Sequence, residues 1–312
     1  MAPDVAFPNI GIEIGTLNRV AFTLPIGDGL AIYWYGIFVV LGVSLGGIVA
    51  FRNTKRNGIT DQLFLDFLLI TVPLAFIFTR AYAVLFNLDL YRDNWVRIFD
   101  FRSGGMGVYG GIISAFVALF VFSKIKKINP GAIGDTGVFG LLIGQILGRM
   151  GNFFNQEAFG GYTDNIFAMQ LRVDNIAARY SGRSLAWLRA IAPENVRSPL
   201  SYELLQNAYY VGDAVVVRVH PAFLYEMMLN TAIFVFLWIY RGRKKFMGEL
   251  ILIYAAAYAL GRFFIESLRT DQLFLWGTDI PISMLVSAIM FVCAVALIVY
   301  FRRRARRGTA DA

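Results

Sequence analysis

Two arginines lie within long apolar stretches of this 312-residue chain. Arg149 occurs in segment 135–155 and Arg262 in segment 249–269, and both segments are rich in glycine and apolar residues. A guanidinium at membrane depth is costly and keeps its proton. It is retained there when an anionic group contacts it, and the candidates are carboxylates of the chain or the phosphate of a lipid. Such a pair therefore predicts binding of an anion at membrane depth.

Polar side chains follow Arg149 at helical spacing. Arg149 and Asn152 are three residues apart and share one face of a helix, which Asn155 and Gln156 extend. The alternative is a helix end capped by asparagine and glycine, with Arg149 extending to the membrane surface. Polar residues this dense at membrane depth usually line a cavity, and we favour that interpretation.

A second charged stripe surrounds Arg262. Arg262, Glu266 and Arg269 are spaced four and three residues apart, so they share one helical face. One interpretation is a neutralised ladder that only lowers the cost of burial. The stripe carries one more positive than negative charge, however, so we expect an anion to balance it.

Glycines open another apolar segment. Five of them lie between positions 104 and 111. This pattern predicts either tight helix packing through small residues or a backbone that bends around a lipid, with Tyr109 facing the cavity.

The only histidine, His220, begins the motif HPAFLYE. A lone histidine is more often structural than catalytic. Glu226 follows six residues later, about 9 Å along a helix, which places it at membrane depth. It needs a partner there, and Arg149 or Arg262 would serve.

Three further residues have polar or reactive side chains. Tyr35 and Asp135 lie at the ends of apolar segments, and Tyr35, beside Trp34, also fits an interfacial aromatic belt. The single cysteine, Cys293, excludes an internal disulfide or a cysteine metal cluster. It lies in an apolar run and is interpreted as a packing residue.

The elements that must position these groups are membrane spans. The chain is 57% hydrophobic and 16% charged, with a mean hydropathy of +0.59, whereas soluble domains are closer to a quarter charged. The apolar residues cluster into runs, which predicts an all-α polytopic membrane protein with seven transmembrane helices and a small mixed extracytoplasmic head. The predicted spans are 30–50, 63–86, 106–123, 136–154, 220–240, 247–268 and 282–301.

Basic residues indicate the orientation of these spans. Of the 29 lysines and arginines, fifteen follow spans one, three, five and seven closely, and all six lysines are among them. By the positive-inside rule these ends are cytoplasmic, so we expect the N-terminus outside and the C-terminus inside. The net charge of +8 therefore reflects membrane topology and does not indicate nucleic-acid binding. No cleavable signal peptide is expected, because residues 1–29 have no apolar core.

The predicted organisation has five parts. These are an extracytoplasmic arm (1–29), spans one to four (30–154), an extracytoplasmic head (155–219), spans five to seven (220–301) and a basic cytoplasmic tail (302–312). In the head, 168–173 and 213–219 are predicted strands, and 201–210 is predicted as a short helix or strand. The head is too small and interrupted to be an independent enzyme domain, so we expect the chemistry at the outer side of the membrane.

Two other membrane activities share some of these sequence features. A transporter of an anionic solute or lipid also has arginines and broken helices at membrane depth, but it more often has two related halves, and no internal repeat is visible. An intramembrane serine protease needs a nucleophile motif such as G-x-S-x-G and a histidine partner. The segment GVSLG (42–46) fits that pattern, but it lies within the apolar run of span one, and the only histidine opens span five instead of accompanying a serine motif. A purely structural membrane protein would not need the buried charge.

Six sequence blocks follow one another along the chain: IYWYG, SGGMGVYGG, GAIGD, GRMGNFFNQEAFG, HPAFLYE and GRFFIESLR. Together, and in this order, they resemble the blocks of one family, the bacterial prolipoprotein diacylglyceryl transferases, and GRMGNFFNQEAFG is similar to the signature of that family. The resemblance covers nearly the whole chain.

The resemblance implies an activity. Members transfer the diacylglyceryl group of phosphatidylglycerol to the thiol of the lipobox cysteine in a prolipoprotein signal peptide, in the bacterial inner membrane. The product is a thioether, and glycerol 1-phosphate leaves. No metal or soluble cofactor is implied, and the partners are the two substrates and the lipid bilayer.

Carried onto this chain, the resemblance implies that Arg149 binds the lipid phosphate and that Arg262 is a second essential arginine. It assigns binding positions to a further group of residues, to which we add Asn155 and Arg269 from the helical stripes and His220 from the motif HPAFLYE. That group is Tyr35, Asn152, Glu157 and Gly160.

The proton acceptor stays open. Many members have a histidine at the position of Tyr109, and a phenol is a poor base at neutral pH. Glu226, Glu266 and Asp135 match acidic positions of the family and are the other candidates.

Overall fold

The computed structural model describes most of the chain. The described residues are 3–27, 29–92, 94–99, 107–173, 204, 206–212, 214–270, 272, 274–275, 278 and 280–310. Parts of the segment between the second and third predicted spans, of the head and of the predicted 201–210 element lie outside them.

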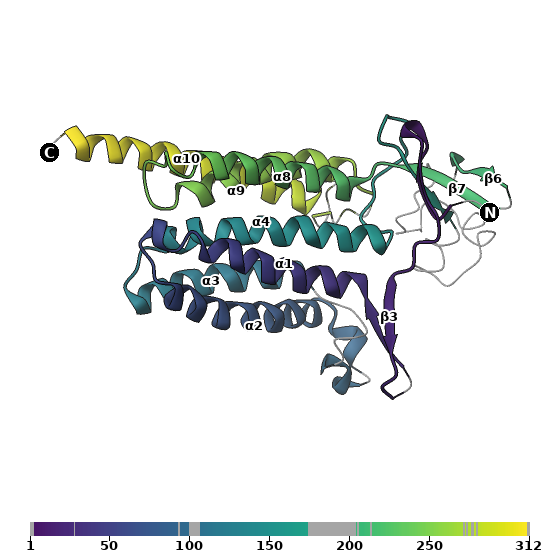
Figure 1. Ribbon diagram of the computed structural model, residues 1–312, viewed down its shortest axis with the longest axis horizontal. Helices are drawn as coiled ribbons and strands as arrows, with labels where there is room; N and C mark the ends of the chain where they lie inside the picture. Colours follow the sequence, from purple (N-terminus) through teal and green to yellow (C-terminus); the bar gives the residue numbers. More distant parts are fainter. Residues whose placement is uncertain are drawn as a thin grey trace. The chain divides into compact units, whose positions relative to one another are not determined.

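Seven helices in the described part of the chain are long and apolar enough to cross a membrane, which confirms the predicted fold class (Figure 1). They are α1 (Trp34–Phe51), α2 (Asp61–Leu85), α3 (Val108–Lys126), α4 (Pro130–Phe154), α8 (Ala222–Tyr240), α9 (Glu249–Ser267) and α10 (Ile282–Ala310). Short 3-10 helices are η1 (Pro8–Ile10), η2 (Lys55–Asn57), η3 (Leu88–Tyr91) and η4 (Trp95–Phe99).

Three helix ends differ by four residues or more from the predicted spans, each for a local reason. The α1 helix begins at Trp34 instead of 30, because β4 (Leu30–Tyr33) pairs with β3 (Val20–Leu24) in an antiparallel hairpin. The α4 helix begins six residues early, with proline at its first position and the Asn129 side chain accepting a hydrogen bond from Gly131 N at 2.8 Å. The α10 helix continues through the basic tail (yellow in Figure 1).

The head contains a five-stranded antiparallel sheet, called the head sheet here. Its strand order is β2 (Ile12–Ile14), β1 (Val5–Phe7), β5 (Met169–Arg172), β7 (Ala214–Val219) and β6 (Tyr209–Val211). The strands predicted in 168–173 and 213–219 are found. The N-terminal strands were not predicted, and they join the same sheet through Val5 paired with Leu171. Buried β-branched and aromatic side chains form its core, including Val217, Val219 and Phe159.

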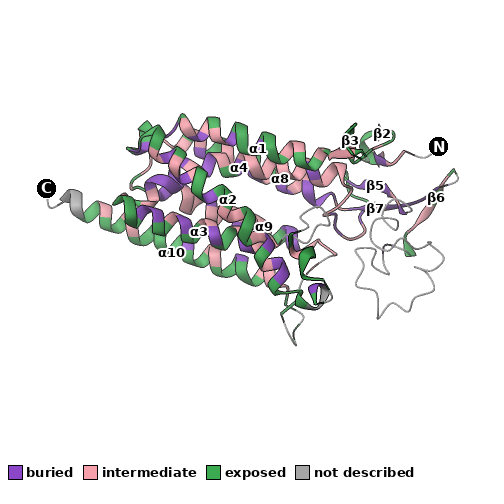
Figure 2. Ribbon diagram, turned by 90° about the horizontal axis from the view of Figure 1, so that it is seen from below, coloured by how far each residue is buried: buried purple, intermediate pink, exposed green. Residues whose placement is uncertain are grey.

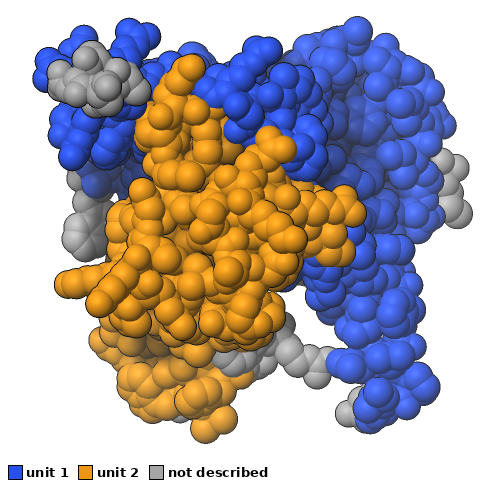
Figure 3. Space-filling view, turned by 60° about the vertical axis from the view of Figure 1, so that its left-hand side comes forward, with its two compact units in different colours: residues 1–46, 140–243, 252–312 blue, residues 47–139, 244–251 orange. Residues whose placement is uncertain are grey.

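The chain divides into two compact units (Figure 3). Unit 1 comprises residues 1–46, 140–243 and 252–312, and unit 2 comprises 47–139 and 244–251. The head sheet, α8, most of α9, α10 and the second half of α4 belong to unit 1.

The packing of α3 on α2 within unit 2 accounts for one glycine of the glycine-rich stretch at 104–111. A side chain at Gly110 would lie 2.1 Å from the carbonyl oxygen of Phe78, so glycine is needed where α3 packs on α2. This contact agrees with the tight-packing interpretation of the glycines.

Burial differs among the helices (Figure 2). In the apolar stretch of α4, 44% of the residues are buried, against 11% in α2 and in α10, whose exposed residues are green in Figure 2. The helix that carries Arg149 is therefore the most enclosed span.

Candidate active site

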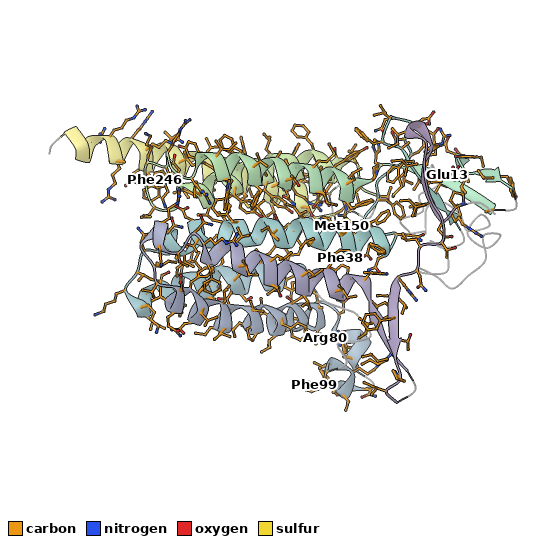
Figure 4. All side chains as sticks on the ribbon, viewed as in Figure 1. Glu13, Phe38, Arg80, Phe99, Met150 and Phe246 are labelled. Atoms are coloured by element: carbon orange, nitrogen blue, oxygen red, sulfur yellow. The ribbon has the colours of Figure 1, made fainter. Side chains whose placement is uncertain are left out.

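The last turns of α4 position the first arginine of the site. Met150, labelled in Figure 4, marks this part of the helix, which ends at Phe154. Arg149 Nη1 donates to Asn152 Oδ1 at 3.0 Å, as their spacing of three residues predicts. This bond fixes one edge of the guanidinium and leaves its other nitrogens for additional partners.

Glu226 on α8 joins the two arginines. Its side chain is 1% exposed, and its carboxylate forms salt bridges with Arg149 Nη2 and with Arg262 Nη1. The partner expected for this glutamate is thus found twice. Both guanidiniums converge on one carboxylate at membrane depth, where electrostatic interactions are strong.

The stripe on α9 continues from this point. Arg262 Nη2 forms a second salt bridge, with Glu266, and Arg269 Nε lies 4.0 Å from the same Glu266 oxygen. Glu266 is buried. Glu226 from the neighbouring helix therefore offsets part of the positive charge of the stripe, but it also pairs with Arg149, so one positive charge remains in excess among these five residues.

A strained turn follows α4 and holds Glu157. Asn152 Nδ2 and Asn155 Nδ2 both donate to Glu157 Oε1 at 2.9 Å. The residues on either side, Gln156 and Ala158, have left-handed φ angles of 51° and 58°. Such conformations are costly for residues other than glycine and persist where the surroundings fix them. The turn therefore orients Asn152, and through it Arg149.

Tyr35 reaches the same helix from α1. A Cβ atom at Gly151 would lie 2.5 Å from a carbon of the Tyr35 ring, so the ring packs directly on the α4 backbone between Arg149 and Asn152. Only glycine at position 151 permits this approach.

Gly160 lies where three backbone segments meet. Its N–H donates to His220 O at 2.8 Å, and it forms an antiparallel bridge with Arg269. Gly161 N donates to Leu268 O at 2.8 Å. A Cβ atom at Gly160 would be 2.4 Å from that same Leu268 oxygen. The junction therefore fixes the end of α9, and with it Arg269, against the start of α8.

His220 has polar neighbours on the head side. Its Nδ1 lies 3.2 Å from Tyr225 Oη, and Asn165 Nδ2 donates to that hydroxyl at 3.1 Å. Burial lowers the pKa of His220 below its usual value. The ring is therefore mainly neutral at pH 7.

Comparison with known proteins places the chain in a family. A family model described as "Prolipoprotein diacylglyceryl transferase" matches residues 19–300. The chain belongs to this family.

Curated relatives agree, and each is named phosphatidylglycerol–prolipoprotein diacylglyceryl transferase. The protein of Clostridioides difficile is 33% identical over 295 residues, covering 95% of this chain and 100% of the relative. That of Finegoldia magna is 34% identical, covering 92% and 97%. That of Staphylococcus aureus is 33% identical, covering 94% and 92%.

Two residues that the family resemblance singles out, Asp135 and Tyr109, belong to unit 2, and their contacts lie within that unit. Asp135 on α4 is fully buried, forms a salt bridge with Lys244 at 2.9 Å and accepts hydrogen bonds from Gly248 N at 2.9 Å and Ile251 N at 3.1 Å. Tyr109 on α3 has its ring 6.0 Å from that of Tyr82. Their roles in the transferase reaction stay predictions.

Several polar residues of the site were missed in the sequence. Tyr258 of α9 lies close to the Arg149 and Arg262 guanidiniums. One turn along α9, the Tyr254 hydroxyl accepts a hydrogen bond from Gln145 Nε2 at 2.7 Å. The available signal was their spacing, because Tyr258 precedes Arg262 by four residues and Gln145 precedes Arg149 by four.

A third arginine in an apolar segment, Arg80 of α2, also escaped notice (labelled in Figure 4). It is 3% exposed, and its guanidinium donates to the carbonyl oxygens of Ile98 at 2.8 Å and Arg97 at 2.7 Å. It also lies over the Tyr91 ring at 5.4 Å. Backbone carbonyls thus satisfy this guanidinium, which fixes η4 and indicates a structural role.

Proposed function

We propose that this chain transfers the diacylglyceryl group of phosphatidylglycerol to the lipobox cysteine of prolipoproteins. Family membership supports the reaction class, because relatives covering nearly the whole chain carry that name. The observation that carries the residue-level proposal is the convergence of Arg149 and Arg262 on Glu226. Two guanidiniums around one anionic group are the arrangement that a lipid phosphate requires.

The reaction is a displacement at carbon. The cysteine sulfur attacks the glyceryl carbon bonded to the phosphate oxygen, a carbon–sulfur bond forms and the carbon–oxygen bond breaks. Its electron pair passes to the phosphate oxygen, and glycerol 1-phosphate leaves. Negative charge on the phosphate grows in the transition state, so fixed guanidiniums in a water-poor site lower the barrier. The nucleophile belongs to the substrate, and the enzyme needs none of its own.

Glu226 couples binding to proton transfer in this proposal. A lipid phosphate that enters between the two guanidiniums competes with the Glu226 carboxylate for them. The released carboxylate is then free to accept the thiol proton. We prefer it to Glu266 because Glu226 alone contacts both Arg149 and Arg262 among the described residues. Asp135 and Tyr109 are the other candidates for the proton acceptor.

The surrounding polar residues act as positioning groups. Asn152, Asn155 and Glu157 hold the Arg149 guanidinium in one orientation, and Tyr35 packs on the same turn. Gly160 fixes the segment that carries Arg269, together with the backbone of His220. Loss of any of these contacts would shift the guanidiniums without removing their charge.

The direct test uses lysine substitutions and radiolabelled phosphatidylglycerol. Arg149→Lys and Arg262→Lys keep the charge but lose the two-pronged geometry. We expect each to lower kcat/KM for transfer to a lipobox peptide by about 100-fold or more, the usual loss when one preorganised donor is removed. Arg243→Lys, at an exposed position, is the matched control and should retain activity. Full activity in both site variants would contradict the proposal.

The protein is a multi-pass membrane protein, and we propose that its N-terminus and head face outward in the bacterial inner membrane. The positive-inside distribution of basic residues supports this orientation. A reporter protein that works only in the cytoplasm should be active when it is fused after residue 312. If a reporter that works only outside the cytoplasm were active at that position instead, the proposed topology would be reversed.

A further inference from the structure

One buried amide near the site has no partner. Asn230 on α8 is 0% exposed, and within the described part of the chain neither its Oδ1 nor its Nδ2 makes a hydrogen bond. Nearly all buried polar groups are hydrogen-bonded, because an unpartnered one costs free energy. Nothing in the arrangement of the charged residues explains this amide.

Asn230 lies one helical turn from Glu226 on the same face of α8. On α4 the same spacing recurs, because Gln145 lies one turn from Arg149, and Gln145 contacts Tyr254 of α9. In both α8 and α4 the step leads away from the head and toward the middle of the membrane. A layer of polar groups therefore lies about 6 Å further in than the charged residues.

Two contacts bring the helices together in or next to this layer. Gln145 Nε2 donates to Tyr254 Oη at 2.7 Å, which joins α4 to α9. A Cβ atom at Gly261, the residue before Arg262, would be 2.2 Å from Leu229, the residue before Asn230, so α8 and α9 approach closely next to this layer, on the side of the charged residues. Gln145 Oε1 is also buried without a partner among the described residues. We call Asn230, Gln145 and Tyr254 the inner polar layer.

The hydrogen-bonding capacity of this layer indicates its ligand. Asn230 offers two N–H donors and one acceptor oxygen, and Gln145 offers a second acceptor. The ester carbonyls of a lipid would satisfy only the donors and would leave both amide oxygens without partners. A peptide group supplies one N–H and one C=O, and so matches a side-chain amide on both sides.

We propose that the inner polar layer binds the backbone of the prolipoprotein signal peptide just before the lipobox cysteine. This inference rests on the proposed function, which places the cysteine sulfur beside the phosphate at Arg149 and Arg262. A depth of about 6 Å corresponds to about two extended residues. A peptide that is extended at membrane depth must have its N–H and C=O groups satisfied by protein. Asn230 and Gln145 supply the missing partners.

Asn230→Leu tests this proposal, with Thr231→Ala as the control. Leucine has nearly the same size and removes the costly amide, so we expect the free protein to be at least as stable as the wild type. Thr231 is exposed and, among the described residues, its side chain bonds only to Met227 O of its own helix, at 2.7 Å. Binding of a fluorescent lipobox peptide is measured by anisotropy without added phosphatidylglycerol, and transfer is measured separately. We expect Kd and KM for the peptide to rise at least tenfold in Asn230→Leu, with KM for phosphatidylglycerol unchanged.

Other outcomes overturn the proposal. A rise in KM for phosphatidylglycerol with unchanged peptide binding would assign the layer to a lipid ester. Unchanged values for both substrates would leave a buried water as the partner of Asn230. If Asn230→Leu does not fold, Asn230→Ala is judged by the same criteria. If the wild type binds the peptide but shows no transfer, the proposed function is contradicted, whereas the proposed peptide-binding role of the inner polar layer is not.

Discussion

At the scale of single residues, Glu226 dominates the electrostatics of the site. It is 1% exposed and contacts two guanidiniums that would otherwise repel each other at membrane depth. Burying charges is expensive, and the cost is offset only when every charge has a close partner. The cluster is therefore stable with Glu226 in place, and it is prepared to accept a second anion that competes with this carboxylate.

Glu226→Gln should separate these two effects. The variant leaves both arginines without their shared carboxylate, so we expect a loss of about 3 kcal/mol in stability, typical of a broken buried ion pair. Added glycerol 1-phosphate should raise its thermal midpoint more than that of the wild type, because no carboxylate competes. Transfer should slow if Glu226 accepts the proton. Glu13→Gln, at an exposed position of β2 (labelled in Figure 4), is the control. A Glu226→Gln protein as stable as the wild type would refute this account.

Gly160 provides a second residue-scale prediction with a neighbouring control. A methyl group at position 160 would lie 2.4 Å from Leu268 O, whereas at Gly161 it would lie 4.0 Å from the same atom. We expect Gly160→Ala to lose about 1–3 kcal/mol of stability, as overpacked sites do, and at least tenfold in kcat/KM. Gly161→Ala should stay within about 0.5 kcal/mol of the wild type. Thermal unfolding and transfer assays on both proteins measure the difference, and equal behaviour would argue against the junction.

At the scale of elements, the sequence was most informative where spacing alone decides. The separation of three residues predicted the Arg149–Asn152 contact, and the apolar runs predicted all seven helices. Contacts between segments that are far apart in the sequence could not be predicted from residue spacing. The pairing of Val5 with Leu171 and of Asp135 with Lys244 depends on how the chain folds back, which local spacing does not encode.

Local backbone geometry could not be predicted from the sequence either. Residues 30–33 are apolar and extend the first predicted span, yet they form β4 because residues 20–24 pair with them. The left-handed φ of Ala158 follows from the hydrogen bonds around Glu157 and not from an alanine preference. Asn230, in an apolar stretch of α8, gave no sign of being unpartnered.

The head sheet should respond to acid. Hydrogen bonds from Arg218 of β7 and from Asn9 lower the pKa of the Asp164 carboxyl, and burial lowers the pKa of His220. Both groups bind protons more readily in the unfolded chain, so stability falls as pH falls. Protonation of the histidine lowers the stability below about pH 6.5, and protonation of the carboxyl lowers it below about pH 4. Hydrogen exchange of β7 at pH 7, 5.5 and 4 measures this loss.

Two variants assign the pH windows of the head. His220→Gln should remove the loss between pH 7 and 5.5, and Asp164→Asn should remove the loss near pH 4. Protection of β7 that increases on acidification from pH 7 would be incompatible with the lowered pKa values.

At the scale of the whole molecule, the chain passes four times between the two compact units. One short segment, 244–251, belongs to unit 2, although the residues before and after it in the chain belong to unit 1. Asp135 fixes this segment within unit 2 by accepting hydrogen bonds from Lys244, Gly248 and Ile251. Lys244 also donates to Asn57 Oδ1 at 2.6 Å. The carboxylate is thus fully occupied, which favours an anchoring role over proton transfer.

Asp135→Asn tests this division of roles. The change leaves the Lys244 ammonium without its carboxylate in a buried place, so we expect a loss of about 3–5 kcal/mol in stability. The double variant Asp135→Asn, Lys244→Met should recover much of this loss, because it removes both charges together. Turnover per folded molecule should stay close to that of the wild type in the double variant. Thermal unfolding gives the stability, and transfer normalised to folded protein gives the turnover. A well-folded double variant without transferase activity would instead place Asp135 in the chemistry.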